Sequence, residues 1–429
     1  MMRPAIFIFS LLIALQLPFM AAVRAQGGTE QLLVEEVLHD LRGNILPFWI
    51  KYSPDPGGGF YGEIRNNGTP IPQSPRGGVL NARILWTFSR AYHLFGEEEY
   101  KALADRAQHY FIQHFIDKEM GGSYWTVNAD GTMGNSAKQT YGIAYAIYGM
   151  AEHYRATGND ESLNQAVALF QSLEKYAFDP LNGGYIESFN RDWSKPERYG
   201  YDGAGVAPKT MNTHLHLLEA YSLLYQVWPD AFLEKQLRGL ISLFTEKIVN
   251  RETWHQKLYL TMDWENLEEI DSYGHDIELS WLLYEAAEAL GDEDLSDEIK
   301  TVALNLVDTQ MAEGWNGEMG YMNYESIDGQ LIRKIDWWPQ AESVVAFYNA
   351  WQITQDEKYL AAALKTWSFV KENLIDDEYG GWYSGLDAEN RPATGRPKAD
   401  LWTCPYHNSR MGFELFVRSQ QHQENNHFE

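Results

Sequence analysis

The sequence predicts an all-α protein folded as an (α/α)6 barrel, a closed ring of twelve helices with short β-hairpin loops at one end. Two independent markers recur along the chain with a shared period of about 62 residues. Between the markers, apolar residues recur at helical spacing. No linker of biased composition separates the repeats, so residues 26–429 are expected to form one barrel domain.

The first marker is a glycine followed by aromatic or apolar residues. Its copies are Gly58-Gly59-Phe60-Tyr61, Gly121-Gly122-Ser123-Tyr124, Gly183-Gly184-Tyr185-Ile186, Met319-Gly320-Tyr321-Met322 and Gly380-Gly381-Trp382-Tyr383. The interval between the third and fourth copies is double, and the missing copy is expected near residues 257–260.

The second marker is a tight helix-to-helix turn followed by acidic residues. It occurs at Gly96, Gly158, Pro229, Gly291 and Gln355, with one stretched interval as well. The two markers together predict six helix pairs. An open solenoid is the alternative, but solenoids usually need atypical terminal repeats, and the sequence shows none.

The helices are expected near residues 31–50, 79–95, 97–116, 138–156, 160–177, 209–227, 230–248, 272–290, 292–310, 339–354, 356–374 and 405–418. Even-numbered helices such as 272–290 are apolar nearly all round, which predicts an inner ring. Odd-numbered helices such as 292–310 carry charge on one face and are expected outside. Ser136 and Asp271 are expected to cap two inner helices, and the polar tail after residue 418 is expected to fray.

The amino terminus predicts a secretory signal peptide. Arg3 precedes an apolar run that is short for a bilayer crossing, and Val23-Arg24-Ala25 resembles a cleavage site. The mature chain is therefore expected to begin near Gln26 and to be secreted or periplasmic.

The charge of the chain excludes some partners. A formal net charge of −26 repels phosphate backbones and anionic lipids, so neither nucleic acid nor a membrane surface is an expected partner. Cys404 is the only cysteine, so no internal disulfide can form, and a small buried residue is expected there rather than a nucleophile. The oligomeric state is left open, with a monomer expected.

Polar and aromatic residues mark the first turn of every expected inner helix. They are Arg83, Tyr141, Asn212 with His216, His275 with Glu278, Glu342 beside Trp338, and His407 beside Trp402. In a closed ring these helix ends converge, so the residues are expected to share one cavity. Capping does not explain an arginine and three histidines, because the helix dipole disfavours cations at this end.

Spacing suggests partners for some of these groups. His275 and Glu278 are three residues apart on one helix face, where a carboxylate would fix the imidazole tautomer. His214 lies two residues from His216 and faces elsewhere, so a structural role is expected for it. Trp338 and Trp402 are expected to contact a sugar.

Three kinds of chemistry fit these residues to different degrees. A metal site built from two histidines and a carboxylate is a minority reading, because no HExxH motif or histidine-rich tract is present. A glycoside hydrolase would use Glu278 and Glu342 but leaves the histidines without a task. Proton abstraction next to a carbonyl uses imidazoles as acid and base and Arg83 as the enediolate's donor, which favours a sugar C2 epimerase.

The segments "NARILWTFSRAY", "KTMNTHLHLLEAY", "YGHDIELSWLLYEAAEALG", "WWPQAE" and "WTCPYHNSRMGFEL" resemble the disaccharide branch of the N-acylglucosamine 2-epimerase superfamily, over residues 30–418. The resemblance implies the (α/α)6 barrel, no cofactor, and interconversion of glucose and mannose at the reducing end of a β-1,4-linked disaccharide.

The resemblance also implies roles for individual residues. It makes His275 and His407 the acid/base pair, with His216 assisting ring opening and Glu278 supporting the site. The residues implied to hold the substrate are Arg83, Tyr141, Asn212, Trp338, Glu342 and Trp402. Aldose–ketose isomerisation and non-catalytic sugar binding remain alternatives, and the choice between cellobiose and mannobiose stays open.

Overall fold

The computed structural model describes residues 28–201, 203, 205–387 and 389–428. The signal peptide expected over residues 1–25 lies outside the described residues. No helix in these ranges is both long enough and apolar enough to cross a bilayer.

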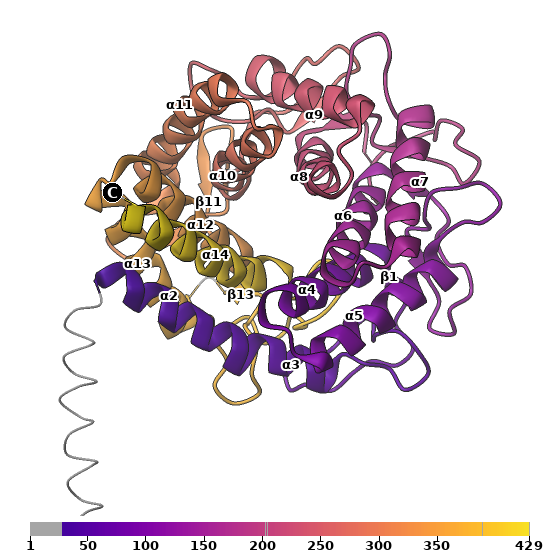
Figure 1. Ribbon diagram of the computed structural model, residues 1–429, viewed down its shortest axis with the longest axis horizontal. Helices are drawn as coiled ribbons and strands as arrows, with labels where there is room; N and C mark the ends of the chain where they lie inside the picture. The colour runs from indigo at the N-terminus through magenta and orange to yellow at the C-terminus, as the bar shows by residue number, and fades with distance from the viewer. Residues whose placement is uncertain (1–27, 202, 204, 388, 429) are drawn as a thin grey trace, which may run out of the picture.

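Two concentric rings of helices form the described chain, as the repeat predicts (Figure 1). The inner ring consists of α4 (Gly78–Phe95), α6 (Thr140–Thr157), α8 (Met211–Val227), α10 (Tyr273–Leu290), α12 (Trp337–Thr354) and α14 (Tyr406–Phe428). The outer ring consists of α2 (Thr29–Asp40) with α3 (Leu46–Tyr52), α5 (Glu98–Tyr110), α7 (Asp160–Tyr176), α9 (Ala231–Leu243), α11 (Glu293–Thr309) and α13 (Glu357–Asn373). The ring closes where α14 packs against α4.

Burial separates the two rings in the way the apolar patterns predict. Inner helix α12 is buried without interruption from Trp337 to Trp351. Outer helix α7 buries only one face, which includes Ala166, Leu169, Phe170 and Leu173. The core therefore lies between the rings and among the inner helices.

Single π-helical turns extend or interrupt several outer helices. The turn η1 (Leu41–Ile45) joins α2 to α3, and η2 (Phe111–Phe115), η3 (Phe244–Ile248) and η4 (Gln310–Gly314) end α5, α9 and α11. In these four repeats, the outer helix therefore consists of an α-helical part and one π-helical turn.

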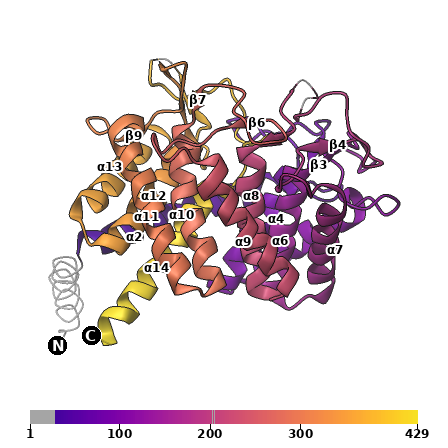
Figure 2. The same cartoon turned by 90° about the horizontal axis from the view of Figure 1, so that it is seen from above.

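Short antiparallel strands lie in the loops at one end of the barrel (Figure 2). In five pairs, the strand that precedes an inner helix pairs with a strand in the loop that follows the next outer helix. These pairs are β1 (Arg76–Gly77) with β2 (Thr126–Val127), β3 (Lys138–Gln139) with β4 (Ser188–Phe189), β5 (Lys209–Thr210) with β6 (Tyr259–Leu260), β7 (Ile270–Asp271) with β10 (Glu325–Ile327), and β12 (Ile335–Asp336) with β13 (Gly385–Leu386). A bridge between Ile64 and Ala399 completes this pattern around the ring. Local hairpins are formed by β8 (Trp315–Asn316) with β9 (Tyr321–Met322) and by β10 with β11 (Gln330–Ile332).

The glycine marker corresponds to a tight turn in these loops. Gly183 and Gly184 have φ of 73° and 72°, a left-handed conformation that favours glycine. A Cβ at Gly184 would lie 2.6 Å from His214 Nε2. Lys209, buried in strand β5, donates to Asp179 at 2.8 Å and to the Gly183 carbonyl at 2.7 Å. This copy of the motif therefore forms a tight turn that the hydrogen bonds of Lys209 stabilise.

Three sequence predictions about helix ends are wrong. Ser136 and Asp271 are not caps, because α6 has Gln139 at its N-cap position and α10 has Ser272. The last helix does not end near residue 418 but continues to Phe428. Gln352 donates to the Arg418 carbonyl at 2.9 Å, and the His422 ring lies 5.1 Å from that of Trp351, so the tail is anchored on α12.

Candidate active site

The first turns of the inner helices and Asp336 of strand β12 surround a cavity of about 350 Å³. Nine of the ten predicted site residues line it: Arg83, Tyr141, Asn212, His216, His275, Glu278, Trp338, Trp402 and His407. The tenth, Glu342, lies directly behind His407. Residues separated by more than 300 positions in the sequence therefore meet at one site.

Residues from the loops and strands, together with Trp337 at the start of α12, also line this cavity and were not assigned by sequence reasoning. They are Tyr324, Lys334, Asp336, Trp337, Arg396, Asp400 and Thr403. Asp336 pairs with Lys334 at 2.8 Å and with Arg396 at 2.7 Å. This part of the cavity therefore carries charged groups.

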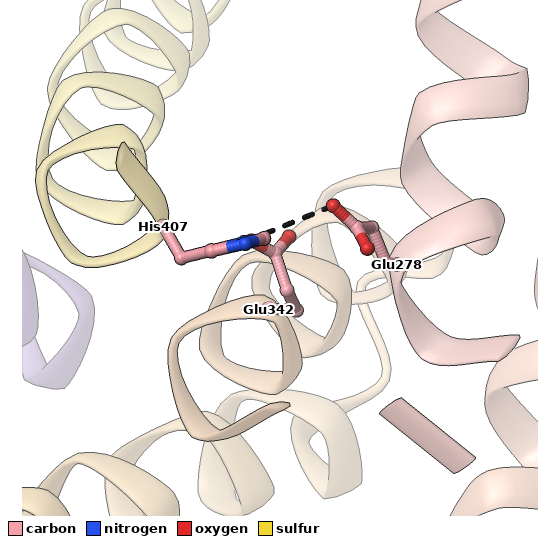
Figure 3. A group of neighbouring side chains, drawn as sticks. All are labelled: Glu278, Glu342 and His407. Atoms are coloured by element: carbon pink, nitrogen blue, oxygen red, sulfur yellow. Dashed lines mark hydrogen bonds and ion pairs between the residues drawn. The ribbon is translucent and has the colours of Figure 1, made fainter. Parts of the chain in front are cut away.

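His407 is oriented by a carboxylate from the neighbouring inner helix. Its Nδ1 lies 2.7 Å from Glu342 Oε1 and 3.8 Å from Glu278 Oε1 (Figure 3). Its Nε2 has no hydrogen-bond partner among the described residues. Burial and the charge of Arg83 lower the pKa of His407, so the ring is neutral at neutral pH.

Glu342 therefore occupies a different position from the one that substrate binding implies. Its Oε2 accepts a hydrogen bond from Trp281 Nε1 at 3.0 Å, and its Oε1 accepts one from Arg410 at 2.7 Å. The carboxylate is buried beneath His407 and does not line the cavity. This geometry fits a group that orients His407.

Arg410 is the cation that the sequence analysis missed. Its guanidinium is buried and donates to Glu219, Glu278 and Glu342, which come from three other inner helices. Arg410 follows His407 by three residues, so the pair shares one face of α14. That three-residue spacing was the sequence feature that could have indicated Arg410 as a site residue.

The prediction that Glu278 binds His275 is wrong. Glu278 points to Arg410 and His407, and His275 Nδ1 instead lies 2.7 Å from Ser272 Oγ. Burial and the neighbouring charge of Glu342 raise the pKa of Glu278. Because both carboxylates contact one guanidinium, they support the His407 side of the site.

His275 lies on the cavity beside Trp338. The centroids of the two rings are 4.8 Å apart, and Trp338 also lies 5.5 Å from the ring of His407. Both imidazoles therefore pack on one indole. Burial, followed by the charge of His216, lowers the pKa of His275 to about 3, so it too is neutral at neutral pH.

His216 has a carboxylate partner on its own helix. Its Nδ1 lies 3.0 Å from Glu219 Oε2, three residues along α8, and the Tyr145 hydroxyl is 2.9 Å from the same nitrogen. Burial lowers the pKa of His216 to about 4. Although burial opposes it, the charge of Arg410 lowers the pKa of Glu219, which stays ionised.

Arg83 supplies a fixed positive charge among the first-turn residues of the cavity. Its guanidinium donates to the hydroxyls of Tyr141 at 2.9 Å and Tyr145 at 2.6 Å, and it stacks 4.2 Å from the Tyr145 ring. Its Nε is buried and has no hydrogen-bond partner among the described residues. A fixed cation of this kind can stabilise a developing oxyanion.

Aromatic rings form the wall of the cavity around Trp402. This side chain is 36% exposed, and its ring lies 4.9 Å from Tyr201 and 6.0 Å from Tyr141. An exposed indole beside polar groups is suited to stacking against a sugar ring.

The two residues predicted to be structural lie outside the cavity. His214 is fully buried, with Nδ1 2.7 Å from the Thr210 carbonyl and Nε2 accepting from the Tyr185 amide at 2.9 Å. Cys404 is buried, and burial raises the pKa of its thiol. Neither residue has the environment of a nucleophile or base.

Glu278, Glu342 and His407 also form a cluster with ligand atoms within 4.8 Å of one another. The oxygens of Glu278 and Glu342 that face His407 are the ones that accept hydrogen bonds from Arg410. A metal ion would compete with this guanidinium for the same oxygens. The donor set therefore fits an arginine-bridged carboxylate pair better than a metal centre.

The comparisons with known proteins agree on one family. The N-acylglucosamine 2-epimerase (GlcNAc 2-epimerase) family matches residues 59–408. A cellobiose 2-epimerase from Bacteroides fragilis is 44% identical over 390 residues, which cover 90% of this chain and 99% of the relative. A cellobiose 2-epimerase from Dictyoglomus turgidum is 35% identical over 390 residues, with the same coverage.

Solved structures give the same result. The cellobiose 2-epimerase from Bacillus thermoamylovorans aligns with a TM-score of 0.87 and 35% identity, covering 90% of this chain and 100% of its own. A D-mannose isomerase shares the fold, with a TM-score of 0.78 and 21% identity over 90% of this chain and 98% of its own. The extent of these matches shows that the chain belongs to the N-acylglucosamine 2-epimerase family.

Proposed function

We propose that this protein reversibly epimerises C2 of the reducing-end glucose or mannose of β-1,4-linked disaccharides such as cellobiose and mannobiose. The observation that carries the proposal is the packing of His275 and His407 on Trp338 in one cavity that also contains Arg83. Relatives of 44% and 35% identity are cellobiose 2-epimerases. A cavity of about 350 Å³ is within the usual size range of small-ligand sites.

The geometry supports a two-base exchange. After ring opening assisted by His216, one of His275 and His407 takes the C2 proton. The electrons of the C–H bond move into the C1 carbonyl and give an enediolate, whose oxygen is held by Arg83. After a small rotation about the C2–C3 bond, the other histidine, which enters this step as the imidazolium, returns its proton to the opposite face of C2, so that it becomes neutral and the aldehyde is restored.

The residues of the site disfavour glycoside hydrolysis. An inverting hydrolase needs two carboxyl groups on opposite sides of the scissile bond. Glu278 and Glu342 instead converge on the same guanidinium nitrogen, and Glu342 does not line the cavity. The reaction proposed here uses protein groups alone and needs no cofactor.

Heavy water distinguishes the proposed reaction from its alternatives. The protein is incubated with cellobiose in heavy water, and the products are followed by NMR. Deuterium at C2 together with a mannose-type reducing end supports epimerisation. A ketose with deuterium at C1 would indicate aldose–ketose isomerisation, monosaccharides would indicate hydrolysis, and unchanged cellobiose and mannobiose would refute the proposal.

The acid/base pair is tested by substitution. His275→Asn and His407→Asn should each lower kcat by about 10²-fold to 10⁴-fold, the usual contribution of a positioned acid or base. The matched control is His109→Asn, because His109 is exposed on outer helix α5. Near-normal turnover in either active-site variant would contradict the assignment.

We also propose that the protein is exported. The support is the sequence of residues 1–25, in which Arg3 precedes an apolar run and a small-residue cleavage site. Export places the enzyme in the periplasm or outside the cell, where its disaccharide substrate would arise from cleavage of a β-1,4-linked polysaccharide.

A further inference from the structure

Ser272 occupies a capping position without capping its helix. It is the N-cap residue of α10, yet its side chain accepts no backbone N–H of the first turn. Serine at this position usually accepts such a bond. The side chains of Asn159, Asp230, Asp292 and Asp356 do so at the N-termini of outer helices. The Ser272 hydroxyl is therefore available for another partner.

That partner is His275. Ser272 Oγ lies 2.7 Å from His275 Nδ1, and the serine is 2% exposed. No second hydrogen-bond partner of Oγ occurs among the described residues. A buried hydroxyl without an acceptor for its proton is costly, so the O–H donates to Nδ1. This arrangement leaves the imidazole proton on Nε2.

His407 has the opposite arrangement. Both oxygens of Glu342 already accept N–H bonds, from Arg410 and Trp281, and Oε1 faces His407 Nδ1 at 2.7 Å. Burial raises the pKa of Glu342, and the charge of Arg410 opposes this shift. Because both oxygens already accept N–H bonds, the carboxylate also acts as the acceptor toward His407, so Nδ1 of His407 carries the proton. Its Nε2 then presents a lone pair.

We propose that Ser272 is a positioning residue that holds His275 in the tautomer with its proton on Nε2. The resting site then offers an N–H from His275 and a lone pair from His407. The catalytic meaning of this pairing rests on the function proposed above. His407 can take the C2 proton in this state, and the His275 N–H donates a hydrogen bond to the sugar. His275 returns a proton to C2 only from its imidazolium form, which leaves the ring neutral.

The choice of a hydroxyl over a carboxylate has a chemical consequence. A hydroxyl donates when Nδ1 is unprotonated and accepts when it is protonated, by rotation about the Cβ–Oγ bond. When His275 is protonated on both nitrogens, Ser272 can accept from Nδ1–H, and transfer of the Nε2 proton to C2 leaves a neutral imidazole that keeps its partner. An epimerase that works in both directions requires this change of role from its acid/base groups.

The surrounding contacts hold this turn of α10 in place. Asp276, next to His275, accepts hydrogen bonds from His255 Nδ1 at 2.7 Å and from the Gln256 amide at 2.9 Å. The Asp276 amide in turn donates to the Ser272 carbonyl at 2.9 Å. The ring of His275 is packed against Trp338 on its cavity side. These contacts restrict the position of the His275 ring that the Ser272 hydroxyl contacts.

A pair of cap variants separates positioning from stability. Ser272→Ala should lower kcat on cellobiose by about tenfold or more while KM stays within about threefold, because a group that fixes a catalytic imidazole is lost. Its melting temperature should fall less than that of a cap variant, since no capping bond is removed and only the contact with His275 Nδ1 is lost. Asn159→Ala, which removes a true cap on outer helix α7, should lower the melting temperature and leave kcat unchanged. A Ser272→Ala enzyme with unchanged kcat, or with a kcat loss that only accompanies unfolding, would overturn the proposal.

The tautomer is measured directly, without substrate. The protein is labelled with ¹⁵N-histidine, and the ring signals of His275 and His407 are assigned by their loss in the His275→Asn and His407→Asn variants. The proposal expects Nε2–H for His275 and Nδ1–H for His407, with the His275 signals alone changing in Ser272→Ala. An Nδ1–H tautomer for His275, or His275 signals unaffected by Ser272→Ala, would refute it. Because this readout needs no turnover, it stands even if cellobiose and mannobiose prove not to be substrates.

Discussion

Arg410 and Glu342 meet at 2.7 Å, and the Glu342 oxygen that accepts this bond is the one that lies 2.7 Å from His407 Nδ1. Arg410 also binds Glu219, the partner of His216. One buried guanidinium therefore fixes the carboxylates that orient two of the three cavity histidines. The catalytic groups are coupled through a residue that does not itself line the cavity.

Arg410→Lys should disrupt this coupling. Lysine keeps the charge but lacks the planar fork that reaches three carboxylates, so buried hydrogen bonds are lost. We expect the free energy of unfolding to fall by about 1–3 kcal/mol and kcat to fall with it. Urea unfolding and steady-state kinetics measure the two effects. Arg238→Lys is the control, because Arg238 makes only part-exposed pairs on the outer ring. Equal effects of the two substitutions would contradict the role of Arg410.

Glu342→Gln and Glu278→Gln should differ, although both carboxylates bind Arg410. Glutamine in place of Glu342 no longer fixes the His407 tautomer, so kcat should fall by about tenfold or more with little change in KM. Glu278→Gln should cost less, because the raised pKa of Glu278 means that its neutral form is already accessible near neutral pH.

Stability measurements against pH complete this comparison. A carboxyl group with a raised pKa in the folded state lowers stability as the pH rises above its unfolded value of about 4.3. The Glu278→Gln variant should therefore gain stability relative to the wild type as the pH increases. A larger kcat loss in Glu278→Gln than in Glu342→Gln would reverse the assignment of the two residues.

The sequence was sufficient to predict the barrel and the location of its site. Helical spacing and a repeated marker are local signals, and ring closure brings the starts of the inner helices together. His216 and Glu219 also illustrate a local signal, since they are three residues apart on α8. The sequence analysis assigned His216 but passed over its partner.

Contacts between helices were harder to predict from spacing. Glu278 lies three residues after His275 and Ser272 three residues before it, so both are within reach on the helix. Arg410, which comes from α14, attracts Glu278 away and leaves Ser272 as the partner. Other residues of the cavity, such as Lys334 and Arg396, come from loops that carry no periodic signal.

Signal-peptide cleavage is expected after Ala25. Mass spectrometry of the exported protein should give Gln26 as the first residue, because small residues at positions 23 and 25 suit the cleavage site. Replacement of Ala25 by a large residue, as in Ala25→Leu, should block processing and leave a longer chain. Exported wild-type protein that retains residues 1–25 would contradict the prediction.

His214→Asn tests the distinction between a structural and a catalytic histidine. The sequence predicts a structural role for His214, and the structure shows that both ring nitrogens are bonded to backbone groups of two segments. We therefore expect the free energy of unfolding at pH 7 to fall by about 1–3 kcal/mol, while kcat stays within about twofold because His214 does not line the cavity.

The pH dependence of this loss provides a second, independent check. Burial lowers the pKa of His214 to about 4, below the usual value of about 6.5. Between these values the unfolded chain binds the proton and the folded chain does not. The stability contributed by the neutral ring is thus complete above about pH 6.5 and is lost as the pH falls toward 4. Asparagine does not titrate in this range. The difference in free energy of unfolding between wild type and variant, measured by urea unfolding, should therefore shrink as the pH falls from 7 to 5. His109→Asn, at an exposed position, should show neither effect. A stability difference that does not change with pH, or a large loss of kcat, would contradict the structural role of the neutral His214 ring.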